Sequence, residues 1–294
     1  MTAIAADFAG SPSADPILAN APHRIGKVSL LVRDLDRVGR FYQEVLGLQV
    51  LHATPSLLQL GHGSTALLEL RHRPSARLRS PREAGLFHTA FLLPSRADLA
   101  AWVGHAAERQ VSIHGASDHL VSEAIYLADP EGNGIEIDVD RPSSTWVVAD
   151  GAIRMATEPL DLQALVRDGA GRRWSGFPAG GTVGHVHLQV GDLEPAEAFY
   201  EGLLGFEITC RYPGASFFGS GGYHHQLATN VWNSRGAGAR SDGTTGLEDI
   251  EISVDAATLE AVRARLSNAV ASAEDQSVMT LLDPWGTSIT LLAR

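Results

Sequence analysis

The segment from His119 to Glu136 holds the residues best suited to chemistry, because it brings an imidazole, a phenol and a carboxylate close together in sequence. Ala124-Ile-Tyr-Leu is typical of a strand, and the Asp-Pro-Glu-Gly-Asn-Gly that follows is typical of a turn. A second strand is predicted from Ile135, so Tyr126 and Glu136 can face one cavity from neighbouring strands of a hairpin. Histidine and carboxylate side chains at a cavity are common ligands of transition metals. The hairpin therefore predicts half of a metal site, and the other half must come from elsewhere in the chain.

An internal repeat shows which elements must position this hairpin. The segment Lys-Val-Ser-Leu-Leu-Val-Arg-Asp-Leu from Lys27 reappears as His-Val-His-Leu-Gln-Val-Gly-Asp-Leu from His185. Each copy is predicted to begin with a strand and to continue into an amphipathic helix that an Asp caps and a Gly ends. The predicted capping residues are Asp34, Gly47, Asp192 and Gly205. Two weaker copies begin at His88 and Asp249, with helices expected around 97–108 and 257–266.

Four copies of one βαβββ unit predict an α+β fold with two tandem domains of two units each, forming curved, partly open mixed sheets. Such a sheet covers one face with its helix and leaves a concave face open for a small ligand. We expect residues 1–22 to be a disordered lead-in, 23–140 to be the N-terminal domain and 183–294 to be the C-terminal domain. The segment 141–182 breaks the repeat and is expected to be a connector with a short helix near 161–167.

This organisation resembles the vicinal oxygen chelate superfamily, which includes glyoxalases, bleomycin-resistance proteins, fosfomycin-resistance enzymes and extradiol dioxygenases. The resemblance extends from about residue 23 to the C-terminus. The segment from His119 to Glu136 is similar to the extradiol dioxygenase signature, although Ser117 stands where that pattern has Gly, Asn, Thr, Ile or Val. Gly-Gly-Tyr-His224-His225 is similar to a Gly-x-His-His stretch of the same enzymes. The pattern is closest to the two-domain catechol 2,3-dioxygenases of the CatE type.

The resemblance implies that metal ligands occupy two positions in each unit, one at the start of the first strand and one in the last strand. The opening positions hold Lys27, His88, His185 and Asp249, and the closing positions hold Glu69, Glu136, a residue at or near His225, and Thr290. Because protonated lysine and threonine are poor ligands, units one and four are expected to lack a metal. The expected ligands are therefore His88, His185 and Glu136. Two imidazoles and one carboxylate leave coordination positions open, as in non-haem Fe(II) oxygenases.

These ligands come from units two and three, so we expect those two units to pair across the halves and to leave units one and four to pair with each other. The resemblance implies that His225 is the acid–base residue and that His119 and Tyr126 form hydrogen bonds to substrate or oxygen. His224 is expected to be structural and to point away from His225, because successive strand residues face opposite sides. His187 shares the face of His185 but is also expected to be structural.

The resemblance thus implies an Fe(II)-dependent extradiol dioxygenase, with Mn(II) as a substitute for iron. Its substrates would be O₂ and a catechol-type aromatic diol, and its product a ring-opened muconic semialdehyde. Two alternatives stay open. A glyoxalase-type lyase or isomerase would use a fourth protein ligand, Ni, Zn or Co, and no O₂. A protein that only sequesters a small molecule or drug would need no metal, but it would have no use for an acid–base residue such as His225.

The composition of the whole chain limits which kinds of partner the protein can bind and in which compartment it is expected. A net charge of −11 argues against nucleic acid as a partner. No apolar run approaches the roughly 18–20 residues that would cross a membrane. The single cysteine, Cys210, cannot form an intramolecular disulfide, which fits a reducing cytoplasm. An exposed sheet edge can pair with a second copy of the chain, so a homo-oligomer is left open.

Overall fold

The computed structural model describes residues 16–169, 171–266 and 277–294. Most of the predicted lead-in, residues 1–15, lies outside this part of the chain. Residues Pro16–Asn20 form helix α1, where no secondary structure was expected. Leu18 of this helix is buried against Leu92 and Tyr223, and this contact accounts for the order of the segment.

Units one and two have the predicted element order. Unit one contains β1 (His23–Val32), α2 (Leu35–Phe41) with a π-helical turn (Tyr42–Leu46), β2 (Gln49–Thr54), β3 (Leu57–His62) and β4 (Thr65–His72). Unit two contains β5 (Gly85–Leu92), α3 (Arg96–Glu108), β6 (Gly115–Asp118), β7 (Ser122–Ala128) and β8 (Gly134–Asp140). The helix expected around 97–108 is therefore confirmed as α3.

Units three and four repeat this order. Unit three contains β12 (Thr182–Gln189), α5 (Leu193–Glu197) with a π-helical turn (Ala198–Leu203), β13 (Glu207–Tyr212), β14 (Ala215–Gly219) and β15 (Leu227–Asn230). The described part of unit four contains β16 (Gly246–Val254), α6 (Ala256–Leu266), β17 (Val278–Leu282) and β18 (Ser288–Ala293). The helix expected around 257–266 is confirmed as α6.

The predicted caps explain where the helices begin and end. The carboxylate of Asp34 accepts a hydrogen bond from the backbone N–H of Arg37, and that of Asp192 accepts one from Glu194. Gly47 ends its helix in the left-handed conformation, with φ of 73°, which glycine adopts without steric cost. The local signals of the repeat therefore act as the sequence predicts.

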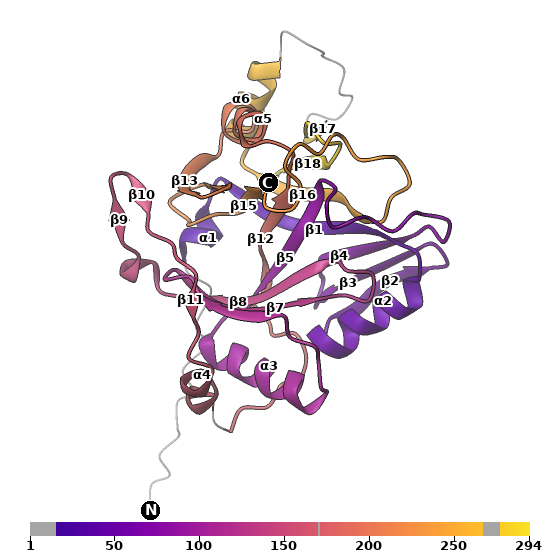
Figure 1. Ribbon diagram of the computed structural model, residues 1–294, viewed down its shortest axis with the longest axis vertical. Helices are drawn as coiled ribbons and strands as arrows, with labels where there is room; N and C mark the ends of the chain where they lie inside the picture. The colour runs from indigo at the N-terminus through magenta and orange to yellow at the C-terminus, as the bar shows by residue number, and fades with distance from the viewer. Residues whose placement is uncertain (1–15, 170, 267–276) are drawn as a thin grey trace, which may run out of the picture.

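Two sheets form the centre of the molecule, and helices α2, α3, α5 and α6 lie around the outside (Figure 1). The larger sheet has the strand order β11-β6-β7-β8-β5-β12-β15-β14-β13, so it combines units two and three. The smaller sheet has the order β17-β18-β16-β1-β4-β3-β2, so it combines units four and one. This confirms the predicted pairing of units across the two halves of the chain. A single hydrophobic core cluster contains residues of all four units.

The segment 141–182 does more than connect the halves. It contains a 3-10 turn (Ser143–Thr145), the hairpin of β9 (Val148–Ala149) and β10 (Ala152–Ile153), strand β11 (Glu158–Pro159) and helix α4 (Leu162–Asp168). Helix α4 is the short helix expected near 161–167. Strand β11 pairs with β6 at the edge of the larger sheet, which places the residues before it beside the concave face.

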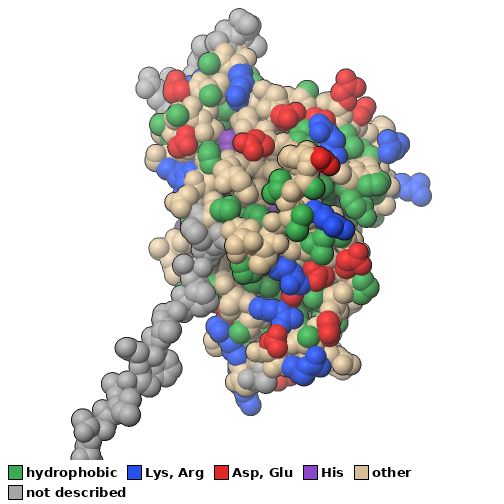
Figure 2. Space-filling view, turned by 90° about the vertical axis from the view of Figure 1, so that its left-hand side faces the viewer, with side chains coloured by type: hydrophobic (Ala, Val, Ile, Leu, Met, Phe, Trp, Pro, Cys, Tyr) green, Lys and Arg blue, Asp and Glu red, His purple; other side chains and the backbone are tan. Residues whose placement is uncertain are grey.

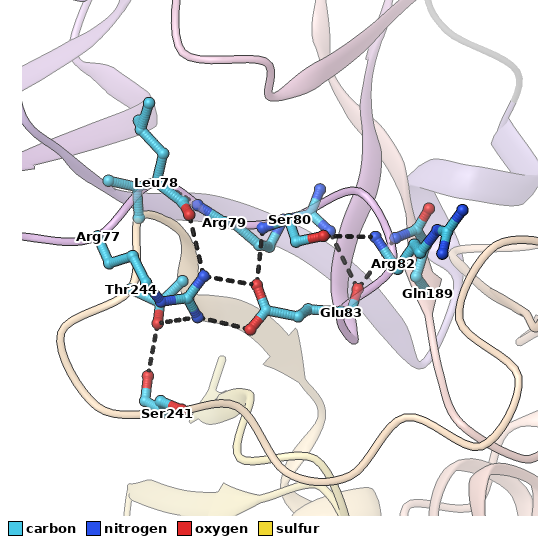
Figure 3. A network of polar contacts seen from close by, with 10 residues as sticks. Arg77, Leu78, Arg79, Ser80, Arg82, Glu83, Gln189, Ser241 and Thr244 are labelled. Carbon is cyan, nitrogen blue, oxygen red and sulfur yellow. Dashed lines mark hydrogen bonds and ion pairs between the residues drawn. The ribbon is translucent and has the colours of Figure 1, made fainter.

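A polar network also joins the halves outside the sheets (Figure 3). Arg77, between β4 and β5, donates hydrogen bonds to both carboxylate oxygens of Glu83 and to the hydroxyl of Thr244. Gln189 at the end of β12 donates to the backbone carbonyls of Pro81 and Glu83, at 3.0 and 3.1 Å. The link between units one and two is therefore bound to the C-terminal half at two points.

The surface carries charges of both signs. On the face drawn in Figure 2, acidic and basic side chains are interspersed, and histidine shows only in small areas. Among the residues that the structure describes, no helix combines the length and the apolar composition that a membrane crossing requires.

Candidate metal centre

Three adjacent strands of the larger sheet bring the predicted ligands together. Strands β5 and β12 are antiparallel neighbours at the seam between units two and three, and His88 lies opposite His187 in their register. Strand β8 runs parallel to β5, with Glu136 opposite Ala90. Because side chains two residues apart share a face, His88, His185 and Glu136 all point to the concave side.

The ligand atoms of these three side chains fit one face of a metal coordination sphere. Oε2 of Glu136 lies 2.9 Å from Nε2 of His88 and 3.5 Å from Nε2 of His185. The two Nε2 atoms lie 3.3 Å apart. An ion bonded at about 2.1 Å to three atoms at right angles would separate them by about 3.0 Å. All three residues are buried, and they form a group that could hold a metal ion.

Electrostatics favours the metal-binding forms of His88 and Glu136. Burial lowers the pKa of His88, against the opposing charge of Glu136, so the imidazole is neutral at neutral pH. Burial alone would raise the pKa of Glu136, but its electrostatic attraction to the His88 and His185 rings, and its hydrogen bonds with them, outweigh burial and hold that pKa well below its usual range. A neutral imidazole at His88 and an ionised carboxylate at Glu136 are the metal-binding forms of these two groups.

Behind the ligands, a second carboxyl group faces the same side of β8. Oδ2 of Asp138 lies 3.9 Å from Nδ1 of His185, and neither atom has a hydrogen-bond partner within the described part of the chain. Burial raises the pKa of Asp138 well above its usual range, and the charges of Glu136 and Asp140 act in the same direction. Burial and the neighbouring negative charges thus both favour the uncharged form of Asp138.

The strand register defines the equivalent positions in the other units. Glu69 lies opposite Ser29 of β1, just as Glu136 lies opposite Ala90 of β5. In unit four the same position is Thr290, as predicted, opposite Glu251. In unit three it is Ala228, opposite His187. The closing position of unit three was expected at or near His225, and the register corrects it to an alanine that cannot bind a metal.

The metal group lies at the wall of a cavity of about 420 Å³. The cavity is lined by Phe87, His88, Ser117, His119, Ser122, Tyr126, Glu136, Met155, Ala156, Thr157, His185, His187, Tyr212, Phe217, His225 and Trp232. All three predicted catalytic residues are therefore beside the predicted ligands. Phe87, Phe217 and Trp232 surround His187 with ring centroids 4.9 to 5.8 Å apart, so one wall is aromatic.

His119 and Tyr126 form a hydrogen-bonded pair at this cavity. Nδ1 of His119 lies 2.7 Å from the carbonyl oxygen of Ala156, an acceptor, so Nδ1 carries the proton. Nε2 of His119 then accepts from the hydroxyl of Tyr126 at 2.5 Å. Burial raises the pKa of Tyr126 well above its usual range, with Glu136 acting in the same direction, so the hydroxyl keeps its proton.

Sequence reasoning missed the part of the site that comes from the connector and from side chains outside the motifs. Met155, Ala156 and Thr157 reach the cavity because β11 pairs with β6, and no local pattern of the connector predicts this long-range pairing. His187 was expected to be structural, but it lines the cavity. Its position on the face of His185 was the signal that could have revealed it.

The expected orientation of His224 is wrong. Nδ1 of His224 lies 2.8 Å from Nδ1 of His225, so the two rings meet instead of pointing apart. The reason is that β15 begins only at Leu227, and the preceding residues form a turn to which strand alternation does not apply.

Comparison with known proteins identifies the family. Residues 24–137 and 182–286 match the family described as the Glyoxalase/Bleomycin resistance protein/Dioxygenase superfamily. The chain belongs to this superfamily. The two matches lie in the two halves of the chain and show that the superfamily domain is present twice in tandem.

Individual members of the superfamily give more detail. Catechol-2,3-dioxygenase of Bacillus subtilis is 39% identical over 229 residues, which cover 76% of this chain and 80% of the relative. Biphenyl-2,3-diol 1,2-dioxygenase 3 of Rhodococcus globerulus is 28% identical over 120 residues, 40% of this chain and 63% of that protein. The crystal structure of glyoxalase I from Zea mays superposes with a TM-score of 0.52 at 18% identity, covering 92% of each chain. This last likeness concerns the fold alone.

Proposed function

We propose that this superfamily member is an Fe(II)-dependent extradiol dioxygenase that cleaves a catechol-type aromatic diol with O₂ to a ring-opened muconic semialdehyde. The observation that carries the proposal is the buried group of His88, His185 and Glu136 on one wall of the cavity. Three protein ligands on one face leave room for both oxygens of a diol. The similarity to a catechol-2,3-dioxygenase over most of the chain supports the same reaction.

In this proposal the metal and the three predicted catalytic residues have distinct tasks. When bound, Fe(II) supplies the Lewis acidity and the redox chemistry with O₂ that the three ligands cannot provide. His225 takes a proton from a substrate hydroxyl and returns it later in the reaction. Burial lowers the pKa of His225 well below its usual range, as do the charges of neighbouring histidines, so the ring begins as a neutral base. Tyr126 and His119 orient the substrate oxygens through hydrogen bonds, and the aromatic wall holds the ring and excludes water.

The lining favours an uncharged ring. Glu136 is its one carboxylate, and none of the lining residues is a lysine or an arginine. A carboxylate on the substrate would therefore lose its hydration without gaining an ion-pair partner, which is unfavourable. We propose catechols with hydrogen or apolar substituents as substrates, in preference to dihydroxybenzoates.

The test combines metal content with oxygen uptake. The protein is reconstituted anaerobically with Fe(II), mixed with catechol or 3,4-dihydroxybenzoate, and exposed to air. We expect oxygen uptake and a yellow product with catechol, at a kcat/KM at least about tenfold above that with the acid, corresponding to about 1.4 kcal/mol. His185→Ala is expected to lose both iron and activity, whereas the exposed His52→Ala keeps both. An iron-loaded protein that consumes no O₂ with a broad panel of catechols would contradict the proposal.

The alternatives are separated by the same experiment. A glyoxalase-type lyase would need a fourth protein ligand, but the metal group found among the described residues has three members. Activity without oxygen uptake would indicate a lyase, and a metal-free protein that binds aromatics would indicate sequestration. Replacing Fe(II) with Mn(II) during reconstitution tests the choice of metal.

We also propose that the protein is cytoplasmic and that it forms a homo-oligomer. The free, buried thiol of Cys210 supports a reducing compartment. Size-exclusion chromatography with light scattering measures the oligomeric state.

A further inference from the structure

A chain of hydrogen bonds leads from His225 into the protein, away from the cavity. Nε2 of His224 lies 2.8 Å from Oδ1 of Asp140, and the hydroxyl of Tyr223 donates to Oδ2 of the same carboxylate at 2.8 Å. Nδ1 of His224 lies 2.8 Å from Nδ1 of His225. Two residues before β15, Tyr223 and His224, thus meet Asp140, the last residue of β8, across the seam between units two and three, and His225 joins the chain through His224.

The donor and acceptor roles along this chain are determined by its carboxylate end. Both oxygens of Asp140 accept, so Nε2 of His224 must carry a proton and donate it to Oδ1. When the His224 ring carries this one proton, its Nδ1 has a lone pair and can only accept. The hydrogen bond between the two rings therefore requires the proton to be on Nδ1 of His225. Nε2 of His225 is the nitrogen left, with its lone pair, for a ligand in the cavity that this residue lines.

The two members of this chain nearest to His225 in sequence are shielded from water. His224 has no exposed surface and Tyr223 has none either. Trp146 from the connector packs over His224, with ring centroids 5.1 Å apart, and its indole N–H donates to the backbone carbonyl of Arg141. At a fully buried imidazole such as His224 the protein, and not solvent, selects the tautomer.

We propose that Asp140 and His224 are positioning residues that hold His225 in the tautomer with the proton on Nδ1 and a basic Nε2 directed to the substrate. The inference rests on the proposed acid–base role of His225. A proton that leaves a substrate hydroxyl binds Nε2, and the resulting positive ring points its Nδ1–H toward His224, with the Asp140 carboxylate at the far end of the chain. The proton returns to the reacting oxygens from Nε2, so His224 and Asp140 neither gain nor lose a proton during the reaction.

Two substitutions of His224 separate this role from simple packing. In His224→Asn, the side-chain oxygen takes the place of Nδ1 and can accept from His225, but the link to Asp140 is lost. In His224→Gln, the amide N–H₂ reaches toward Asp140 as Nε2 does, and the acceptor for His225 is lost. Both variants remove the imidazole, so a purely structural role would affect them alike.

The first measurement is nitrogen-15 NMR of histidine-labelled, zinc-loaded full-length protein, with His225→Gln used to assign the signals. We expect a protonated Nδ1 and an unprotonated Nε2 for His225 in the wild type and in His224→Asn. In His224→Gln we expect the proton on Nε2 or a mixture of tautomers. A wild-type His225 protonated only at Nε2 would overturn the inference, whatever the outcome of the activity assay.

The second measurement is steady-state oxygen uptake with the Fe(II)-loaded enzyme and catechol. His224→Gln is expected to lower kcat about 100-fold with KM changed by less than about threefold, because a base in the wrong tautomer loses the proton transfer and not substrate binding. His224→Asn is expected to keep kcat within about tenfold of the wild-type value.

The control is His23→Gln, at a buried histidine outside the cavity, which tests for general loss of stability and should leave kcat unchanged. Equal losses in the two His224 variants, or none in either, would count against the inference. A wild type that cleaves no catechol would contradict the proposed function and leave the NMR result to decide the tautomer.

Discussion

Lys27 and His88 occupy equivalent positions in two sheets, yet only His88 belongs to a metal group. Nζ of Lys27 lies 2.9 Å from Oε2 of Glu69, the same separation as between His88 and Glu136. The ammonium therefore supplies internally the positive charge that Glu136 would receive from a metal ion. Burial raises the pKa of Glu69, but hydrogen bonds from Lys27 and other neighbours outweigh this effect and keep it low. The residue type at the first ligand position therefore decides the outcome: a histidine leaves the carboxylate free to bind a metal ion, whereas a lysine already neutralises it.

Replacing Tyr126 tests the role of a single hydroxyl group in the proposed reaction. Tyr126→Phe removes the hydroxyl that donates to His119 and leaves the ring and the three metal-binding side chains in place. We expect unchanged iron content and a kcat lower by about tenfold, since one hydrogen bond to the reacting group contributes about 1–2 kcal/mol. Iron analysis and oxygen uptake on the same sample check both parts. Loss of iron would instead assign Tyr126 to metal binding.

At the scale of elements, the Asp-Pro-x-Gly turns of units two and four hold the last two strands of each unit in register. Oδ1 of Asp129 accepts from the backbone N–H groups of Glu131 and Asn133 at 2.8 and 2.9 Å. Asp283 binds Trp285 and Thr287 in the same way, at 2.9 and 2.7 Å. The other oxygen of each aspartate accepts from a buried tyrosine of the preceding unit's helix, Tyr42 or Tyr200. The turns therefore attach each hairpin to its half of the molecule.

Asp129→Ala and Asp283→Ala form a matched pair for this element. Each removes similar buried hydrogen bonds, so each is expected to lower the free energy of unfolding by roughly 2–4 kcal/mol. Only Asp129 lies in the hairpin that carries Glu136, so only Asp129→Ala is expected to weaken iron binding as well, by about tenfold or more. Denaturant unfolding of the metal-free proteins and metal titration measure the two effects. Equal iron affinity in both variants would show that the turn does not position the ligand.

At the scale of the whole molecule, the site exists because each half of the chain pairs with the other in both sheets. His23, the first residue of β1, adds a contact between the halves. Its Nε2–H donates to the carbonyl of Leu204 at 3.1 Å, and its Nδ1 accepts from the hydroxyl of Ser220 at 3.0 Å. The ring also stacks on Phe206, with centroids 4.1 Å apart. All these partners belong to unit three, so the contact depends on the assembly of the halves.

This contact predicts a pH dependence of stability. Burial lowers the pKa of His23 from 6.5 to about 4, whereas in the unfolded chain it returns to its ordinary value. Between these values the unfolded state binds a proton that the folded state does not, so the stabilisation is complete above pH 6.5 and is lost as the pH falls toward 4. The difference of about 2.5 units corresponds to roughly 3 kcal/mol. Denaturant unfolding of metal-free protein at several pH values should show a shallower acid loss for His23→Gln than for the wild type. Parallel curves would rule out this contribution.

The sequence by itself determined the repeat, the helix caps at Asp34 and Asp192, the pairing of unit two with unit three, and the three residues that the structure brings together as a metal group. The repeat and the caps follow from residue type and period, which are local properties of the chain, whereas the pairing and the three residues also depended on the resemblance to the superfamily. The repeat aligns equivalent positions, and only units two and three place imidazole or carboxylate side chains that can act together.

Only the tertiary structure decided which other groups surround the metal group. The carbonyl of Ala156 orients His119 because β11 pairs with a strand distant in sequence, and Trp146, also from the connector, packs against His224. The meeting of His224 with His225 depends on a turn that ends one residue before β15 begins, where strand alternation gives no guidance. Such contacts are set by long-range packing, and no local pattern in a single sequence encodes the path by which a connector returns to a cavity.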